Sequence, residues 1–182
     1  LIRLDLNVPL NGKNITDTNR IDKIIPTLKY LLKNNAKIII ISHIGRPKGK
    51  FVSDLSLKPV CVELVKKLNQ DIKFVEYGID KVEVDKLFNS KTNIIMLENI
   101  RFFKEEENDD VNFAKSLASL ADIYVNEAFS CSHRKHASVH SITNFIPSYS
   151  GIQLETEVNS LKKIILNIKR PISCIIGGSK IS

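Results

Sequence analysis

The sequence predicts an α/β fold in which a parallel β-sheet has helices on both faces. Ile38–Ile41 is an unbroken run of β-branched residues of strand length, and a strand that is apolar on both faces is typical of the middle of such a sheet. Segments with strand patterns also alternate with segments of helical periodicity, as they do in successive βαβ units. Neighbouring strands are therefore expected to run in the same direction.

The first part of the chain contains two strands and the helix between them. Leu1–Leu6 alternates apolar and polar residues and is expected to be a strand. Asn7–Asn19 is rich in turn-forming residues and is expected to be a loop. Arg20–Asn34 has apolar residues at helical spacing, which predicts an amphipathic helix that Pro26 kinks unless this proline lies near the helix start. The isoleucine run then gives a strand over Lys37–Ser42.

The alternation continues to the end of the chain, where Pro171 ends a long helix. Residues 1–150 are expected to form a Rossmann-like three-layer domain, residues 151–170 an interdomain helix, and residues 171–182 the first strand of a second α/β domain. The other predicted strands are Ile72–Val75, Asn93–Leu97, Asp122–Val125 and Ile172–Ile176, and the other predicted helices are Leu57–Leu68, Val82–Phe88, Val111–Leu120, Ser138–Phe145 and Ile152–Ile168.

Composition restricts the possible partners. The 182 residues carry a net charge of +7, which favours nucleic acid, anionic lipid or phosphorylated metabolites. No apolar stretch approaches the ~20 residues of a membrane span, and no signal-peptide pattern is present. Cys61, Cys131 and Cys174 are widely spaced, which suits a reducing cytoplasm and argues against zinc or a disulfide framework. Because Leu1 and Ser182 interrupt predicted elements, we expect the chain to be a fragment.

Arginine is scarce, and its placement is informative. Four of the six arginines lie in segments that follow predicted strands, or open the helix after one. If the strands are parallel, these side chains point from the edge of the sheet where α/β proteins bind ligands. Guanidinium groups recognise phosphate and carboxylate through several hydrogen bonds, although any single one could instead cap a helix or pair with a carboxylate. The four residues are Arg20, Arg46, Arg101 and Arg134.

Three other polar residues are expected at the same edge. His43 directly follows the isoleucine strand and lies with Arg46 around Gly45, which predicts an anion-binding loop, although a plain polar turn is an alternative. Asp5 and Asn7 leave the first strand on the same side. They could accept hydrogen bonds from a ligand hydroxyl, and an Asx turn at the start of the loop is an equally good explanation.

Two groups of residues could be read as metal ligands, but another interpretation explains each group better. His136 and His140 are four residues apart, with His133 nearby, but no carboxylate or cysteine stands beside them at ligand spacing. The acidic segment Glu105–Asp110 could hold Mg²⁺. A solvated loop whose charges favour the next helix N-terminus is the better interpretation. We therefore expect no metal site in these residues.

A glycine pair near the end of the chain is a further candidate. Gly177 and Gly178 follow the last predicted strand and would let the backbone approach a phosphate, whose charge Lys180 could meet. A plain turn explains the same residues. Neither a GxGxxG after the first strand nor a GxxxxGK[ST] is present, which weakens a dinucleotide-binding or P-loop interpretation.

Five short motifs occur in a characteristic order and spacing. They are Asp5-Leu-Asn-Val-Pro9, Ser42-His-Ile-Gly-Arg-Pro47, Leu97-Glu-Asn-Ile-Arg-Phe102, His133-Arg134 before His136-Ala-Ser138, and Gly177-Gly-Ser-Lys180. Over essentially the whole chain, this set resembles the phosphoglycerate kinase family. The resemblance implies that residues 1–150 are the phosphoglycerate-binding N-terminal domain, that residues 151–170 form the hinge, and that residues 171–182 begin the nucleotide-binding domain.

The resemblance also implies an activity and roles for residues. The reaction would be reversible phosphoryl transfer between 1,3-bisphosphoglycerate and ADP, giving 3-phosphoglycerate and ATP. Mg²⁺ would accompany ADP or ATP, mainly on the C-terminal domain. A cytoplasmic monomer with no nucleic-acid or membrane partner is implied, and this fragment alone is expected to be inactive. The implied contacts are Asp5 and Asn7 to the glycerate end, His43, Arg46, Arg101 and Arg134 to the substrate phosphate, Arg20 and Lys180 to the transferred group, and Gly177 and Gly178 to the nucleotide.

The chain departs from the family in one motif. The usual Asn-Asp-Ala-Phe-Gly reads Asn126-Glu-Ala-Phe-Ser130 here, and the extra methylene of Glu127 is expected to shift the loop that carries Arg134. A non-catalytic anion-binding domain is the alternative function, because binding needs only the N-terminal residues. A nucleic-acid-binding domain should show basic residues interleaved with exposed aromatic residues, whereas most aromatic residues here lie within apolar patterns.

Overall fold

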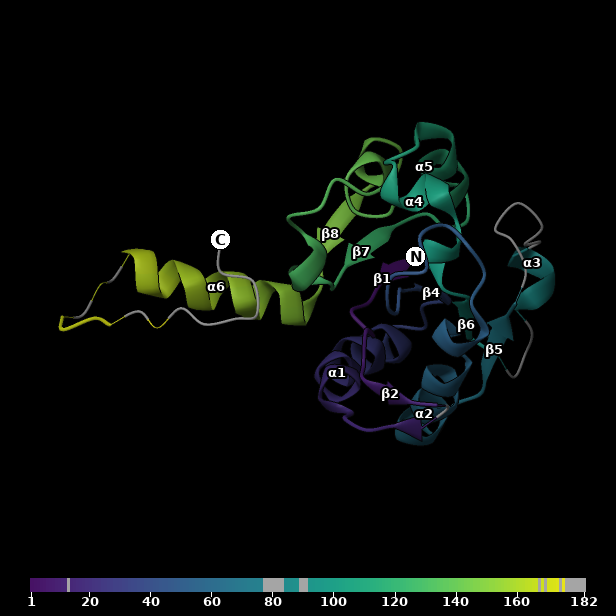
Figure 1. The fold of residues 1–182 in the computed structure, drawn as a ribbon, viewed down its shortest axis with the longest axis horizontal. Coiled ribbons are helices and arrows are strands. Elements are labelled where there is room, and N and C mark those ends of the chain that lie inside the picture. The colour runs from purple at the N-terminus through teal and green to yellow at the C-terminus, as the bar shows by residue number, and fades with distance from the viewer. Residues whose placement is uncertain are drawn as a thin grey trace.

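The structure is a computed structural model that describes residues 1–12, 14–76, 84–88, 92–166, 168, 170–173 and 175. At its centre is a six-stranded sheet with the strand order β5-β6-β4-β1-β7-β8, in which every pairing is parallel (Figure 1). The predicted fold class is thereby confirmed. The strands are β1 (Ile2–Arg3), β4 (Ile38–Ile41), β5 (Ile72–Val75), β6 (Ile94–Leu97), β7 (Tyr124–Asn126) and β8 (Ser148–Ser150).

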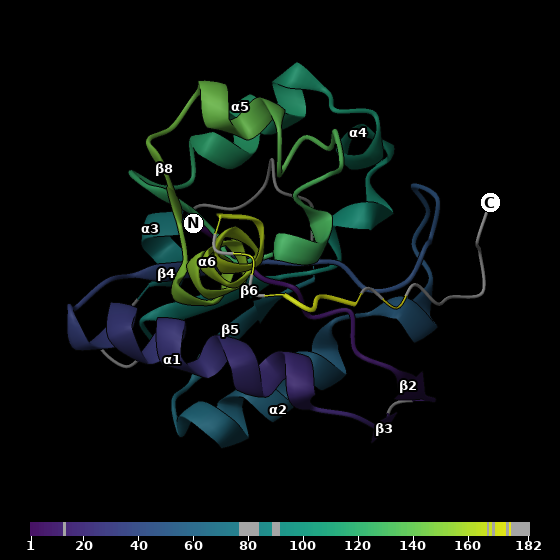
Figure 2. The ribbon, with the colours of Figure 1, turned by 90° about the vertical axis from the view of Figure 1, so that its left-hand side faces the viewer.

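Helices cover both faces of this sheet. Figure 2 shows α1 and α2 below the strands and α4 and α5 above them, so the molecule has three layers. The predicted helices at α1, α2, α5 and α6 are confirmed to within a few residues of their ends. The described helices are α1 (Asn19–Lys33), α2 (Lys58–Leu68), α3 (Val84–Leu87), α4 (Lys104–Glu107), α5 (Val111–Ala118) and α6 (Ile152–Leu166).

The isoleucine run of β4 contributes to both layers of the core. Ile38 and Ile40 pack in one apolar cluster with residues of α1 and α2, and Ile39 and Ile41 pack in a second cluster with residues of α5. Alternate residues of a strand point to opposite faces, so a strand covered on both faces needs apolar residues throughout. The prediction that these isoleucines form a central strand is confirmed, since β4 lies between β1 and β6.

The first strand is shorter than predicted. β1 covers two residues of the expected Leu1–Leu6, and one further backbone hydrogen bond, from Leu4 to Ile41, extends its pairing with β4. The expected loop at Asn7–Asn19 contains a small antiparallel hairpin of β2 (Leu10–Asn11) and β3 (Asn14–Ile15). Gly12 adopts a positive φ of 59° at its turn, a conformation that costs glycine little.

Two further predictions need correction. β8 was not predicted, because its three residues are all exposed and lack an apolar pattern. The segment Ser138–Phe145 was expected to be helical but forms only a 3-10 turn at Ser141–Asn144. Carboxylates of another segment take up its backbone N–H groups, since Glu106 accepts from Ser138 and Asp109 accepts from Ser141. Side-chain acceptors of this kind compete with helical hydrogen bonds.

The last part of the chain extends away from the sheet. α6 begins beside α1 and β7 and projects from the rest of the molecule (Figure 1). At Ile172, Ser173 and Ile175, the predicted last strand does not form, since a strand needs a hydrogen-bonded neighbour. The other residues of that strand, with Gly177, Gly178 and Lys180, lie outside the described residues. Within the described part of the chain, no helix is both long and apolar enough to span a membrane.

Candidate functional site

Most of the candidate residues lie at one edge of the sheet, in the segments that follow four neighbouring strands. These strands are β6, β4, β1 and β7. The carboxyl ends of parallel strands meet at the same edge, which is where open α/β sheets bind ligands. Arg20 joins them from the first turn of α1. The segment after β1 holds Asp5 and Asn7, the segment after β4 holds His43 and Arg46, and those after β6 and β7 hold Arg101 and Arg134.

Arg101 is a buried cation whose hydrogen bonding is incomplete. The residue is 3% exposed, and its backbone N–H donates to the side-chain oxygen of Asn99. Nη1 donates to the Gly45 carbonyl at 2.9 Å, while Nε and Nη2 are buried without a hydrogen-bond partner. Nε lies 3.6 Å from a Glu107 carboxylate oxygen. Because buried polar groups are nearly always hydrogen-bonded, these two nitrogens indicate a missing acceptor.

His43 is buried beside several cations. Nη2 of Arg3 lies 2.8 Å from its Nδ1. Burial lowers the pKa of the His43 imidazole far below its usual value, and the charges of Arg3, Arg101, Arg134 and His136 lower it further. His43 is therefore neutral at physiological pH. It adds a hydrogen-bonding group to the predicted anion site but no positive charge.

A buried network behind His43 was missed by the sequence analysis. Arg3 is completely buried, and its Nε donates to Ser138 Oγ at 3.1 Å. Ser138 Oγ in turn donates to Glu106 Oε1 at 2.7 Å. The expectation that the acidic segment is a solvated loop is wrong for Glu106, which lies on α4 and is fully buried. The backbone N–H of Ser138 also donates to the Glu106 carboxylate. We call Arg3, His43, Arg101 and Glu106 the inner cluster.

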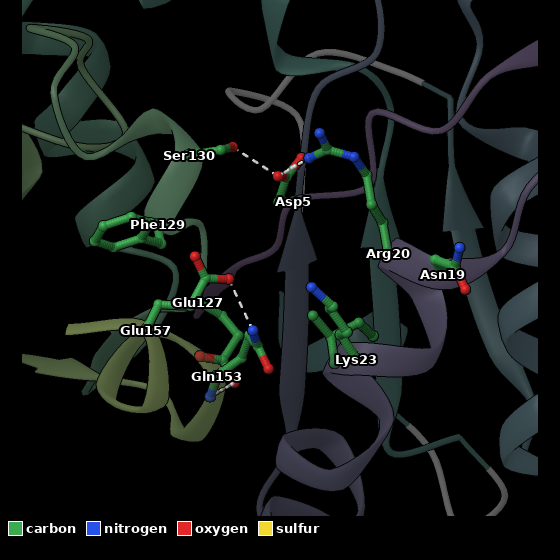
Figure 3. Close-up of a pocket in the computed structure, with 10 residues that line it drawn as sticks. Asp5, Asn19, Arg20, Lys23, Glu127, Phe129, Ser130, Gln153 and Glu157 are labelled. Carbon is green, nitrogen blue, oxygen red and sulfur yellow. Dashed lines mark hydrogen bonds and ion pairs between the residues drawn. The ribbon is translucent and has the colours of Figure 1, made fainter. Parts of the chain in front are cut away.

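A second group of residues lies nearer to solvent. The Arg20 guanidinium pairs with the Asp5 carboxylate, and Ser130 Oγ donates to the same carboxylate oxygen at 2.6 Å (Figure 3). The Arg20 side chain is 45% exposed. The three residues line a pocket of about 290 Å³ between the start of α1 and the segment after β7, which Lys23 also lines. We call Asp5, Arg20 and Ser130 the outer cluster.

Glu127 lies at the far end of this pocket, where it holds the start of α6. Its carboxylate accepts a hydrogen bond from the backbone N–H of Gln153 at 3.1 Å (Figure 3). It also accepts from the backbone N–H of Leu154 at 3.0 Å and from the Thr27 hydroxyl. A carboxylate is favourable at a helix N-terminus because the N–H groups there lack partners. A Cβ at Gly151 would collide with this carboxylate, so the close approach requires glycine.

The remaining predicted residues lie between or beside the two clusters. Asn7 is exposed, and its side-chain oxygen accepts the Gly45 N–H at 2.9 Å, so that oxygen is already used within the protein. Arg46 follows Gly45 and is exposed; with the described residues its guanidinium forms no hydrogen bond or ion pair. Arg134 is half-buried, and its charge acts on both His43 and Arg101.

The histidines that suggested a metal ion face different carboxylates. His140 Nδ1 lies 2.7 Å from Asp109, while His136 Nδ1 lies 3.7 Å from Glu106, too far for a hydrogen bond. Asp109 also accepts the Ser141 N–H, and Asp110 caps α5 by accepting from Phe113. Among the described residues, no three His, Cys, Asp or Glu side chains are grouped so that they could hold a metal ion.

The fold and the two clusters define an α/β protein that gathers basic residues at the carboxyl edge of its parallel sheet. Over its full length, residues 1–182, the chain matches the family model described as phosphoglycerate kinase. It therefore belongs to the phosphoglycerate kinase family.

Individual relatives agree over all of the chain but only part of their own length. The phosphoglycerate kinase of Wolbachia pipientis wMel is 51% identical over 184 residues, and that of Finegoldia magna is 44% identical over 187 residues. Both alignments cover 100% of this chain, but only 46% and 47% of the relatives. The chain thus spans about half the length of the curated relatives that it matches.

Solved structures show the same relationship. The phosphoglycerate kinase of Coxiella burnetii has a TM-score of 0.83 at 34% identity, and that of Pyrococcus horikoshii has a TM-score of 0.82 at 26% identity. Each match covers 93% of this chain, and 43% and 44% of the two solved chains, respectively.

Proposed function

We propose that this chain is the phosphoglycerate-binding part of a phosphoglycerate kinase, which transfers a phosphoryl group reversibly between 1,3-bisphosphoglycerate and ADP to give 3-phosphoglycerate and ATP. Residues 1–150 hold the phosphoglycerate, residues 151–170 are the interdomain helix, and residues 171–182 begin the nucleotide-binding domain. The observation that carries the proposal is Arg101, a buried guanidinium with two nitrogens that lack an acceptor. A phosphate bound at Nε and Nη2 supplies that acceptor.

The substrate phosphate that is not transferred lies against the inner cluster. Arg101 binds it from the buried side, Arg134 and the exposed Arg46 approach it from the neighbouring segments, and His43 donates a hydrogen bond. Each hydrogen bond to a charged group contributes roughly 1.5–3 kcal/mol. These contacts exist before, during and after phosphoryl transfer, so they chiefly determine how tightly the substrate binds.

The outer cluster acts on the reacting end of the substrate. Asp5 and Asn7 bind its glycerate portion, and Arg20 exchanges part of its pairing with Asp5 for the oxygens of the phosphoryl group. Phosphoryl transfer is accelerated mainly by positioning and by charge neutralisation. A guanidinium on the moving group meets the charge that develops in the transition state, and closure of the two domains excludes water from it.

The nucleotide approaches from the other domain. Lys180 reaches the transferred group from that side, and Gly177 and Gly178 let the backbone approach the nucleotide. Mg²⁺ enters with ADP or ATP as part of that substrate. The proposed protein is a cytoplasmic monomer without nucleic-acid or membrane partners, and the buried free thiols Cys61 and Cys131 are consistent with a reducing compartment.

Calorimetric titration of this chain tests the proposal. We expect 3-phosphoglycerate to bind with a one-to-one stoichiometry, inorganic phosphate to bind more weakly, and ATP to give little heat. Binding of ATP without binding of 3-phosphoglycerate would reverse the assignment of the two domains. Equal binding of unrelated polyanions, lost steeply as salt increases, would instead indicate a general anion-binding domain.

A further inference from the structure

Arg3 is a completely buried cation near the proposed phosphate site, and each of its nitrogens contacts a specific neighbour. It is 0% exposed, on the short central strand β1. Nη1 donates to the Leu4 carbonyl at 2.6 Å, Nε to Ser138 Oγ, and Nη2 lies against His43 Nδ1 at 2.8 Å. A long, charged side chain is held in a single position by these contacts.

The contact between Arg3 and His43 fixes where the imidazole carries its proton. A guanidinium has only donors and stays protonated in proteins. Nδ1 of His43 must therefore accept, which it can do only without a proton. The neutral ring then carries its single proton on Nε2. Among the described residues Nε2 has no hydrogen-bond partner, yet it is not sealed from solvent as the Nδ1 of His136 is.

Arg3 does not need a ligand to balance its charge. Burial raises the pKa of the Glu106 carboxyl, but His136, Arg3 and the two hydrogen bonds from Ser138 outweigh this effect, so the pKa lies below its usual value. Glu106 is therefore ionised within the protein. Because Ser138 Oγ accepts from Arg3 and donates to Glu106, it links the two opposite charges. Glu106 thus compensates the charge of Arg3 through Ser138, while Nη2 of Arg3 stays in contact with His43.

We propose that Arg3 is a positioning residue that holds His43 as the Nε2-protonated neutral tautomer, so that His43 is a permanent hydrogen-bond donor to the phosphate of the substrate. This inference rests on the proposed function for the identity of the anion. The groups that face His43 are Arg3 from β1, Arg101 from the turn after β6, and Arg134 and His136 from the segment after β7. All of these disfavour a second proton on the ring.

The tautomer can be measured without any substrate. In the chain with ¹⁵N-labelled histidines, NMR correlation spectra distinguish protonated from unprotonated ring nitrogens, and the signal lost in His43→Gln identifies His43. We expect a protonated Nε2 and an unprotonated Nδ1 that stay unchanged between about pH 5 and 8, where histidine ordinarily titrates. A proton on Nδ1, or a titration of His43 in this range, would overturn the inference.

A pair of variants tests the positioning role. Arg3→Met keeps much of the side-chain volume and removes every donor, so His43 should populate both tautomers and 3-phosphoglycerate should bind roughly tenfold more weakly, about 1.4 kcal/mol. Ser138→Ala cuts the link to Glu106 but leaves the contact of Arg3 with His43, and it should keep the Nε2 tautomer. If Ser138→Ala lost the tautomer to the same extent, the effect would be general loosening, and Arg3 would have no specific role.

The results separate this inference from the proposed function. Absence of 3-phosphoglycerate binding by the parent chain would contradict the proposed function, whatever the tautomer. Binding by a parent chain whose His43 carries its proton on Nδ1 would contradict the role of Arg3 alone. If Arg3→Met does not fold, the spectra of the parent chain still decide between the tautomers.

Discussion

The inner and outer clusters lie at the same edge of the sheet but differ in how deeply their charged groups are buried and in which partners those groups have. In the inner cluster every charged group is buried and held by neutral or oppositely charged partners, apart from the two open nitrogens of Arg101. In the outer cluster Arg20 is 45% exposed and pairs with Asp5. Burial makes an interaction strong and costly to rearrange, whereas an exposed ion pair contributes little and is easily exchanged.

This difference matches the proposed division of labour. A phosphate that stays bound throughout the reaction suits a rigid site whose geometry is fixed before binding. A group that moves suits a cation that can change partners as the domains close, because transition-state contacts matter for rate only when they are stronger than those of the ground state. Substitutions in the two clusters should therefore have different signatures.

The largest expected effect is on turnover and comes from the outer cluster. In a full-length enzyme that carries this chain, Arg20→Ala should lower kcat by ~10³-fold or more, because an arginine on the transferred group supplies that much. Arg20→Lys should recover only part of the rate, because an ammonium lacks the planar fork. Steady-state kinetics with saturating substrates measures this. A kcat within about threefold of the parent, under ~0.7 kcal/mol of barrier, would make Arg20 a binding residue only.

The next largest effect is on stability and comes from the inner cluster. Glu106→Ala leaves the Arg3 charge buried without its counter-charge, so the free energy of unfolding should fall by roughly 3–5 kcal/mol. Urea unfolding followed by circular dichroism gives this value. Glu105→Ala, one residue away on α4 and partly exposed, is the matched control and should stay within about 0.5 kcal/mol of the parent. Equal losses in both variants would mean that Glu106 does not compensate Arg3.

Ligand affinity gives the third effect. Arg101→Ala should weaken 3-phosphoglycerate binding by roughly 1.5–3 kcal/mol, the contribution of hydrogen bonds to a charged group. Lys29→Ala removes the same charge from an exposed position of α1 and should change the dissociation constant little. Calorimetry of the three proteins at one salt concentration makes the comparison. If the two variants weakened binding alike, net charge rather than the geometry of Arg101 would explain the affinity.

The smallest effect is the dependence of stability on pH. The folded protein keeps His43 neutral because its pKa is lowered, whereas the unfolded chain gains a proton as the pH falls below about 6.5. Stability should thus decrease with falling pH, by about 1.4 kcal/mol per unit from this group. His43→Gln should lack this contribution between about pH 6 and 5, while a variant of the exposed His133 should retain it. An unchanged slope in His43→Gln would show that His43 is protonated in the fold.

The sequence predicted elements whose residues carry a local signal. Apolar periodicity identified α1, α2 and β4 because these elements bury one face or both faces. β8 escaped prediction because it is an exposed edge strand of serine and tyrosine. Its place depends on pairing with β7, which is a long-range contact rather than a property of its own residues.

From the sequence, the position of a candidate site residue could be predicted only where the strand topology alone determines it. Arginines that follow parallel strands reach one edge whatever the details of packing, so Arg101 and Arg134 could be placed from the sequence. Arg3 could not, because a charged residue in an alternating strand is usually exposed. Its burial depends on Ser138, 135 residues away along the chain. The charge state of His43 likewise depends on its burial and on cations that lie far from it in the sequence, such as Arg3 and Arg101.

A crystal structure of the chain with 3-phosphoglycerate tests the central claim most directly, because it shows which cluster holds the phosphate. We expect the phosphate within hydrogen-bond distance of Nε or Nη2 of Arg101 and of Nε2 of His43, with the carboxylate end of the ligand directed towards Asp5 and Arg20. A phosphate bound instead beside Arg20 and Lys23, with Nε and Nη2 of Arg101 still unpartnered, would contradict the assignment of the two clusters.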